Sequence, residues 1–175
     1  GSGWRDGTGW KGGRDENAEA PRLNYVRDVD YCSAAALMVD KALWDTVGGF
    51  DQRFAPCYYE DTDLCFAIRQ QGKRVLYQPA AEVLHFEGVS HGTDISEGAK
   101  ANQARHQVTF AQKWPRELAS HAPNGEKPYR EADRGARARI LWLEACVITP
   151  DQDSGSLRTL RLLRLLLKLG CKVTF

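Results

Sequence analysis

The sequence predicts a protein of the α/β class. Short apolar runs with strand character alternate with segments whose apolar residues recur at helical spacing. Glycines stand directly after several of these helical segments, where they favour a stop. Toward the C-terminal end, an apolar run, a helical segment and a second short apolar run follow in the order of a β-α-β unit.

Composition and charge limit the classes of function that this protein can have. The 175 residues carry a formal net charge of +1, which gives no support for a broad basic surface that binds nucleic acid. No apolar run reaches the roughly 20 residues that span a bilayer. The cysteines are scattered, odd in number and form no C-x-x-C pair, so we expect reduced thiols in a cytoplasmic protein.

The first 60 residues predict a loop, a strand and a short helix. Residues 1–21 are polar and rich in glycine, which is typical of a long loop, and residues 31–39 have the small apolar side chains of a buried strand. Asp40 can cap a helix that Gly48 and Gly49 terminate. Its expected apolar face consists of Leu43, Trp44 and Val47.

Two more helices are predicted between residues 61 and 114. Residues 61–71 form the first, with Leu64 and Ile68 on one face and Gly72 as its stop. Short strands at 74–77 and 82–86 and a loop at 87–97 should follow. Residues 99–114 form the second helix. Its expected apolar side consists of Ala101, Ala104, Val108, Ala111 and Trp114, which places His106 on the polar side.

The chain divides into three parts by composition. Residues 1–114 form the first domain, and residues 115–138, which contain His121, form a proline-rich and charged linker. Residues 139–175 begin a second domain, with a strand at 140–148, a helix that Ser154 opens and Gly170 ends, and a strand at 171–175.

The acidic run from Tyr59 to Leu64 is the strongest candidate for chemistry. Glu60, Asp61 and Asp63 stand where a loop enters a helix. One interpretation is structural, because the positive end of the helix dipole favours carboxylates in the first turn. The other is a general base, since transfer of a sugar to a hydroxyl needs a group that accepts the hydroxyl proton.

A second candidate is His85, at the end of a short strand and before a glycine-bearing loop. Neutral imidazole is a common ligand of divalent metals. A histidine that bonds a backbone carbonyl has the same sequence appearance, and both interpretations stay open at this point.

Four motifs in order resemble glycosyltransferase family 2, which has the GT-A fold. They are the strand-like stretch at 29–39, Val47-Gly48-Gly49-Phe50-Asp51 beside the family's "GGFDE-x-F" turn, the acidic run beside its "x-E-D-x-D-L" signature, and Tyr77-Gln78-Pro79 followed by His85. The resemblance covers about residues 24–114. It implies that the first domain is the C-terminal, acceptor-side half of a GT-A nucleotide-diphospho-sugar transferase.

The resemblance also implies roles for single residues. Asp61 would be the catalytic base, with Glu60 beside it, and His85 would help bind a Mg²⁺ or Mn²⁺ ion that holds the donor diphosphate. Asp63 and Ser33 would contact substrate. The reaction would transfer a sugar from a nucleotide-diphospho-sugar to a glycan or lipid-linked glycan, with inversion, in bacterial cell-surface polysaccharide synthesis.

The opening loop resembles an insertion of rhamnosyltransferase-like members of the family. Trp4 or Trp10 could stack on an acceptor sugar there, or could merely anchor the loop. The donor-binding half, with its Asp-x-Asp metal motif, has no counterpart in the sequence; Asp28 and Asp30 have the spacing but precede the wrong strand. We therefore expect a fragment that is inactive alone, and a glycan-binding or scaffold module is the alternative.

The C-terminal unit resembles the start of a GT-B, family 4-like glycosyltransferase domain, with a partial Rossmann-like β-α-β unit. The resemblance rests on residues 149–156, a small-residue loop between a strand and a helix. Arg158, Arg161, Arg164 and Lys168 lie on one side of that helix. They predict either a solvated face or peripheral association with the inner face of an anionic membrane.

Overall fold

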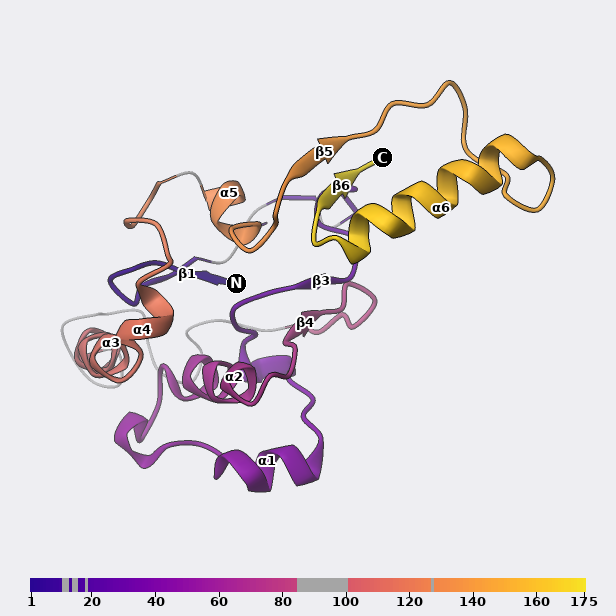
Figure 1. Ribbon diagram of the computed structural model, residues 1–175. Coiled ribbons are helices and arrows are strands. Elements are labelled where there is room, and N and C mark those ends of the chain that lie inside the picture. Colours follow the sequence, from indigo (N-terminus) through magenta and orange to yellow (C-terminus); the bar gives the residue numbers. More distant parts are fainter. Residues whose placement is uncertain (11–12, 14–15, 18, 85–100, 127) are drawn as a thin grey trace. The chain divides into compact units, whose positions relative to one another are not determined.

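The computed structural model describes residues 1–10, 13, 16–17, 19–84, 101–126 and 128–175 (Figure 1). The chain forms two compact units, Gly1–Ala132 and Asp133–Phe175. Short strands and helices are mixed in both, which is consistent with the α/β class. The helices among the described residues are not long and apolar enough to cross a membrane.

In the described part of the first unit, the strands are short and pair in two antiparallel ribbons. β1 (Ser2–Gly3) pairs with β2 (Gly9–Trp10), and β3 (Arg27–Asp28) pairs with β4 (Leu76–Tyr77). The Arg27 guanidinium lies 4.3 Å from the centre of the Tyr77 ring, directly across the second ribbon. A strand at 74–77 was expected, and β4 confirms its second half.

Helix α2 (Glu60–Gln70) is the centre of the first unit, because two apolar clusters use its opposite sides. Leu64, Cys65 and Ile68 face the first cluster, which α1 covers (Figure 1). Phe66 faces the second cluster, where it contacts Phe110 of α3 (Ala101–Lys113). Burial of such a side chain stabilises the fold by about 1.5–3 kcal/mol.

Helix α1 (Lys41–Val47) confirms the expected helix with both of its boundaries. The Asp40 carboxylate accepts from the Leu43 N–H at 2.9 Å, and Gly48 ends the helix with φ 83°. Gly49 also has a positive φ, 67°, and a Cβ there would lie 2.8 Å from the Trp44 ring. Glycine is therefore required for the close approach of this turn to Trp44.

The prediction of a strand at 31–39 is wrong. Ser33 instead begins a 3₁₀ turn, η1 (Ala34–Ala36), and the Ser33 hydroxyl accepts from the Ala35 N–H at 3.4 Å. Small residues are compatible with a short turn as well as with a buried strand, so composition alone did not distinguish the two. The described part of the expected strand at 82–86, residues 82–84, is also not a strand.

The residues expected to form a linker belong largely to the first unit. α4 (Pro115–Leu118) and α5 (Pro128–Ala132) lie within 115–138. Leu118 is 2% exposed and joins the second apolar cluster. His121 is 1% exposed and its Nδ1 lies 2.6 Å from the Gly3 carbonyl oxygen, so this segment closes over β1.

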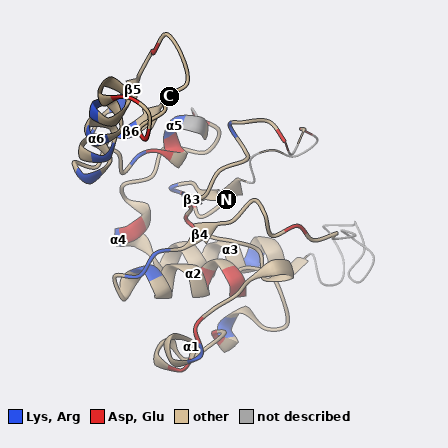
Figure 2. Ribbon diagram, turned by 90° about the vertical axis from the view of Figure 1, so that its right-hand side faces the viewer, with Lys and Arg blue, Asp and Glu red and all other residues tan. Residues whose placement is uncertain are grey.

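The second unit is the expected β-α-β unit. β5 (Arg139–Leu141) and β6 (Lys172–Thr174) are parallel, and α6 (Ser154–Lys168) connects them. The strand expected at 140–148 is therefore much shorter. Asp153, not Ser154, caps α6 through the Ser156 N–H at 2.7 Å. Figure 2 shows the basic residues along α6; their membrane association stays a prediction.

Candidate functional site

The acidic run forms the first turn of α2, as the sequence predicts. Helix α2 begins without a side-chain cap, and its N-cap residue, Tyr59, has φ 73°. Tyr58 before it has φ 72°, so two consecutive non-glycine residues are left-handed. Such a backbone costs on the order of 1–2 kcal/mol per residue, and contacts around the turn must hold it.

The Asp61 carboxylate is fixed by three hydrogen bonds. Its Oδ1 accepts from the N–H of Thr62 at 2.6 Å and from the Thr62 hydroxyl at 3.2 Å. Its Oδ2 accepts from the Ala34 N–H at 3.1 Å, which ties α2 to the η1 turn. A carboxylate has roughly four acceptor positions, so these contacts orient Asp61 and leave Oδ2 with capacity for a further donor.

Asp61 contributes to the raised pKa values of two neighbouring groups, Tyr31 and Cys65. Burial, followed by the negative charge of Asp61, raises the pKa of the Tyr31 hydroxyl well above its usual range. Burial also raises the pKa of the Cys65 thiol to about 12, with a smaller contribution from Asp61. Both groups therefore stay neutral at ordinary pH.

A hollow of about 290 Å³ opens beside the η1 turn, and Ala34 of that turn lines it. Its lining is apolar and aromatic with one cation, and consists of Ala34, Leu37, Val39, Lys41, Trp44 and Phe50. The Trp44 and Phe50 rings meet edge to face at 5.0 Å and form one wall. Ala34 links the hollow to the site, because its N–H donates to Asp61.

Glu60 and Ser33 lie next to Asp61 along the chain and across the turn. Glu60 begins α2 and is half-buried. Burial, followed by the negative charge of Glu60, raises the pKa of the Cys57 thiol. Ser33 directly precedes the residue whose N–H contacts Asp61. The structure thus brings three of the expected site residues, Glu60, Asp61 and Ser33, to one place.

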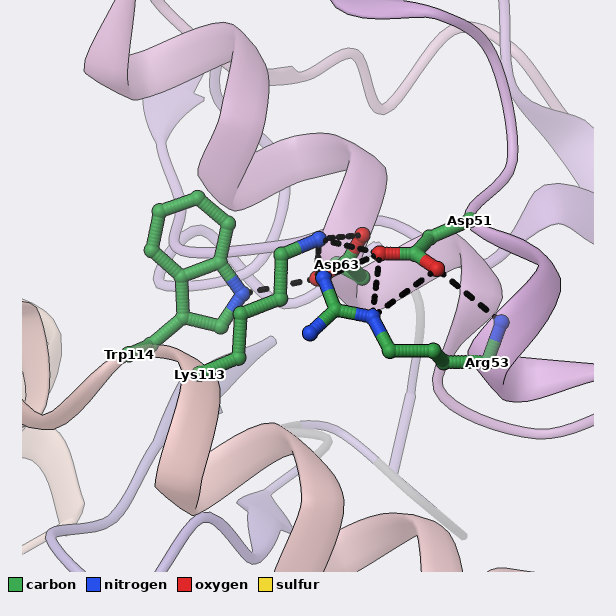
Figure 3. Close-up of polar contacts among 5 residues, drawn as sticks. All are labelled: Asp51, Arg53, Asp63, Lys113 and Trp114. Carbon is green, nitrogen blue, oxygen red and sulfur yellow. Dashed lines mark hydrogen bonds and ion pairs between the residues drawn. The ribbon is translucent and has the colours of Figure 1, made fainter.

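Asp63 has a different environment from the one expected. It is 2% exposed, and its Oδ1 accepts from the Trp114 indole N–H at 2.7 Å (Figure 3). The Lys113 ammonium lies 2.8 Å from its Oδ2. Positions two apart on a helix differ by about 200° around its axis, so Asp63 faces the core while Asp61 faces the η1 turn. Asp63 joins α2 to α3 and does not line the site.

The same ammonium extends the network to η2 (Gln52–Phe54). Lys113 lies 2.8 Å from Asp51 Oδ2, and the Arg53 guanidinium lies 2.6 Å from the same oxygen (Figure 3). Hydrogen bonds from Arg53, and then from Lys113, hold the pKa of the Asp51 carboxyl well below its usual range. This network fixes the approach to the acidic run.

The remaining expected residues have separate locations. Trp4 is 3% exposed, so its ring is covered and anchors the opening segment, whereas Trp10 is half-buried in β2. Asp28 pairs with Arg74, and Asp30 pairs with Arg69. His85 lies outside the described residues. Within the part of the chain that the structure describes, no group of three or more His, Cys, Asp or Glu side chains is placed to hold a metal.

The sequence interpretation missed His106, which is 1% exposed and lies in the core. Its ring meets Phe54 edge to face at 5.6 Å, and its Nδ1 lies 3.0 Å from the Cys57 and Tyr58 carbonyl oxygens. His106, Phe110 and Trp114 recur at intervals of four, and this periodicity would have placed the histidine on the buried stripe.

About half of the chain is similar to rhamnosyltransferases. It is 37% identical over 84 residues to the N-acetylglucosaminyl-diphospho-decaprenol L-rhamnosyltransferase of Mycobacterium tuberculosis. The aligned residues are 48% of this chain and 26% of that protein. It is 33% identical over 82 residues to rhamnosyltransferase WbbL of Escherichia coli, or 47% of this chain and 30% of that protein. These similarities support the glycosyltransferase resemblance.

A longer similarity of lower identity is to an uncharacterized protein of Sinorhizobium fredii, at 27% identity over 93 residues, or 53% of this chain and 10% of that protein. The chain therefore spans 10% to 30% of the length of these curated relatives. No protein-family model matches the chain. No solved structure matches it either.

Proposed function

We propose that this chain carries the acceptor side of an inverting glycosyltransferase of the GT-A type. The protein would move a sugar, with L-rhamnose as the first candidate, from a nucleotide-diphospho-sugar to a glycan or lipid-linked glycan in cell-surface polysaccharide synthesis. The rhamnosyltransferase names of two relatives support the choice of sugar. The acceptor named for one of them, a sugar diphospho-polyprenol, supports the acceptor class.

The observation that carries the proposal is the setting of Asp61. Its carboxylate stands at the start of α2, oriented by Thr62 and Ala34, with acceptor capacity on Oδ2. A general base must come within about 2.6–3.2 Å of the proton that it abstracts. An acceptor hydroxyl at Oδ2 would donate its proton to Asp61 as its oxygen attacks the anomeric carbon and the nucleotide diphosphate leaves.

We propose that the donor-binding half is a separate part of the same protein. The described residues around Asp61 do not include a group of three or more His, Cys, Asp or Glu side chains placed to hold a metal. Any Mg²⁺ or Mn²⁺ would require His85 together with that donor-binding part. We accordingly expect no turnover from residues 1–175 alone.

The decisive experiment is Asp61→Asn in the full-length protein. The amide keeps the size of the side chain but cannot accept the hydroxyl proton, so kcat should fall by about 10²–10⁴-fold. Transfer of tritiated L-rhamnose from its nucleoside diphosphate to an N-acetylglucosaminyl-diphospho-polyprenol measures the effect. Asp45→Asn, an exposed carboxylate on α1, is the control and should keep wild-type turnover. Unchanged turnover in Asp61→Asn would show that Asp61 is not the base.

A further inference from the structure

A buried histidine on α3 contacts the backbone immediately ahead of Asp61. The His106 Nδ1 lies 3.0 Å from the carbonyl oxygens of both Cys57 and Tyr58. A carbonyl oxygen only accepts, so Nδ1 carries the proton and donates to both. On the other edge of the ring, an N–H of Arg105 lies 3.3 Å from Nε2, which fits an acceptor there. One neutral tautomer satisfies all three contacts.

The carbonyls that His106 holds belong to the strained turn. Tyr58 and Tyr59 are both left-handed, and the chain passes from them directly into the acidic run. The Tyr59 carbonyl then accepts from the Asp63 N–H at 2.8 Å and closes the first turn of α2. Phe110, one helical turn after His106, packs its ring 5.4 Å from the Tyr59 ring. Helix α3 thus contacts both left-handed residues.

We infer that His106 is a positioning residue for Asp61, an inference that rests on the proposed function. Its N–H keeps the Cys57 and Tyr58 carbonyls directed toward α3 and thereby maintains the left-handed turn. Without this donor, Tyr58 and Tyr59 relax toward the negative φ values that L-residues prefer. The first turn of α2 then rotates, and the Asp61 carboxylate leaves the Ala34 N–H. His106 itself touches no reacting atom.

The test compares two substitutions of His106 in the full-length protein. His106→Phe keeps the ring and its edge contact with Phe54 but removes the donor. His106→Asn places an amide N–H near the former Nδ1. Because misplacement of a catalytic group by about 1 Å costs on the order of 10²-fold in rate, His106→Phe should lower kcat by about 10–100-fold. KM for the donor should not change, and His106→Asn should recover much of the lost kcat.

His121→Phe is the matched control. His121 is equally buried, at 1% exposure, and also contacts a carbonyl oxygen through Nδ1, that of Gly3. It lies 3.3 Å from the buried Glu131 carboxylate as well, so its loss should lower Tm at least as much. Turnover per folded molecule should nevertheless stay at the wild-type level. Equal loss of kcat in His106→Phe and His121→Phe would overturn the inference.

Amide hydrogen exchange separates this inference from the proposed function. The Ala34 N–H donates to Asp61 Oδ2, so its exchange rate reports the position of that carboxylate. We expect faster exchange in His106→Phe and unchanged exchange in His121→Phe. If the wild-type protein transfers no sugar, the proposed function fails, and exchange alone decides the positioning. Unchanged Ala34 exchange in His106→Phe would then refute it.

Discussion

At the scale of single residues, two carboxylates of α2 separated by one position have opposite environments. Asp61 is half-buried beside the η1 turn, and its bonds are to a hydroxyl and to backbone N–H groups. Asp63 is buried and bonds an ammonium and an indole N–H. The helix turns by about 100° per residue, and this rotation separates a candidate base from a core ion pair.

Replacement of Asp63 tests that division. Asp63→Ala removes the acceptor of the Trp114 N–H, while Lys113 keeps its ion pair with Asp51. A buried donor without an acceptor should lower the free energy of unfolding by about 1–3 kcal/mol. Asp45→Ala breaks an ion pair whose carboxylate is 58% exposed, and it should change stability by less than about 1 kcal/mol. Urea unfolding followed by circular dichroism measures both. Similar losses in the two variants would contradict the core role of Asp63.

At the scale of elements, α3 contacts the segment that leads into α2 and the first turn of that helix, residues 51–63. His106 bonds the turn at Tyr58, and Lys113 joins Asp51 to Asp63. These positions on α3 are separated by seven residues, two helical turns, so they lie on one face. The position of the acidic run therefore depends on a helix about 40 residues further along the chain.

The Asp51 carboxyl makes this connection sensitive to acid. Its pKa is lowered in the folded protein from the ordinary value of 3.8, so its contribution to stability is full above that value. The contribution disappears as the pH falls from about 4 toward the lower folded pKa. The difference in Tm between wild type and Asp51→Asn should accordingly be constant from pH 5 to 7 and shrink below about pH 4. Calorimetry at constant ionic strength measures it, and a gap that stays constant down to pH 2 would exclude the ion pair as its source.

At the scale of the whole molecule, the first unit ends near Ala132 and not near Trp114. Leu118 fills the second apolar cluster, and His121 contacts β1. The Glu131 carboxylate accepts from the Ala122 N–H at 3.1 Å, which holds α5 to this segment. A segment rich in proline and charge therefore completes the core.

Two truncated chains test whether the first unit ends at Ala132 or at Trp114. A chain that ends at Ala132 keeps all of these contacts and should unfold cooperatively, with a Tm close to that of the first unit in the whole chain. A chain that ends at Trp114 loses Leu118 and His121, and the loss of one buried leucine alone costs about 2–5 kcal/mol. Its Tm should be lower by more than about 10 °C. Equal thermal stability of the two truncated chains would place the boundary at Trp114.

Local patterns were sufficient where local interactions decide the structure. Asp40 and the Gly48-Gly49 pair bounded α1, Gly72 follows α2 with φ 71°, and the β-α-β order of the second unit was confirmed. Caps and left-handed glycines act within about four residues, so the sequence contains their whole cause. The acidic run was likewise placed correctly at a helix start.

Tertiary structure alone decided which polar residues enter the core. His106 and His121 lie among polar neighbours in the sequence, but partners 48 and 118 positions away bury them. The same holds for Asp63, whose partners lie about 50 residues away. A buried polar group is stable only when hydrogen-bonded, and its partners exist only once the chain has folded. The sequence determined where Asp61 stands on its helix, and the fold determined what holds it there.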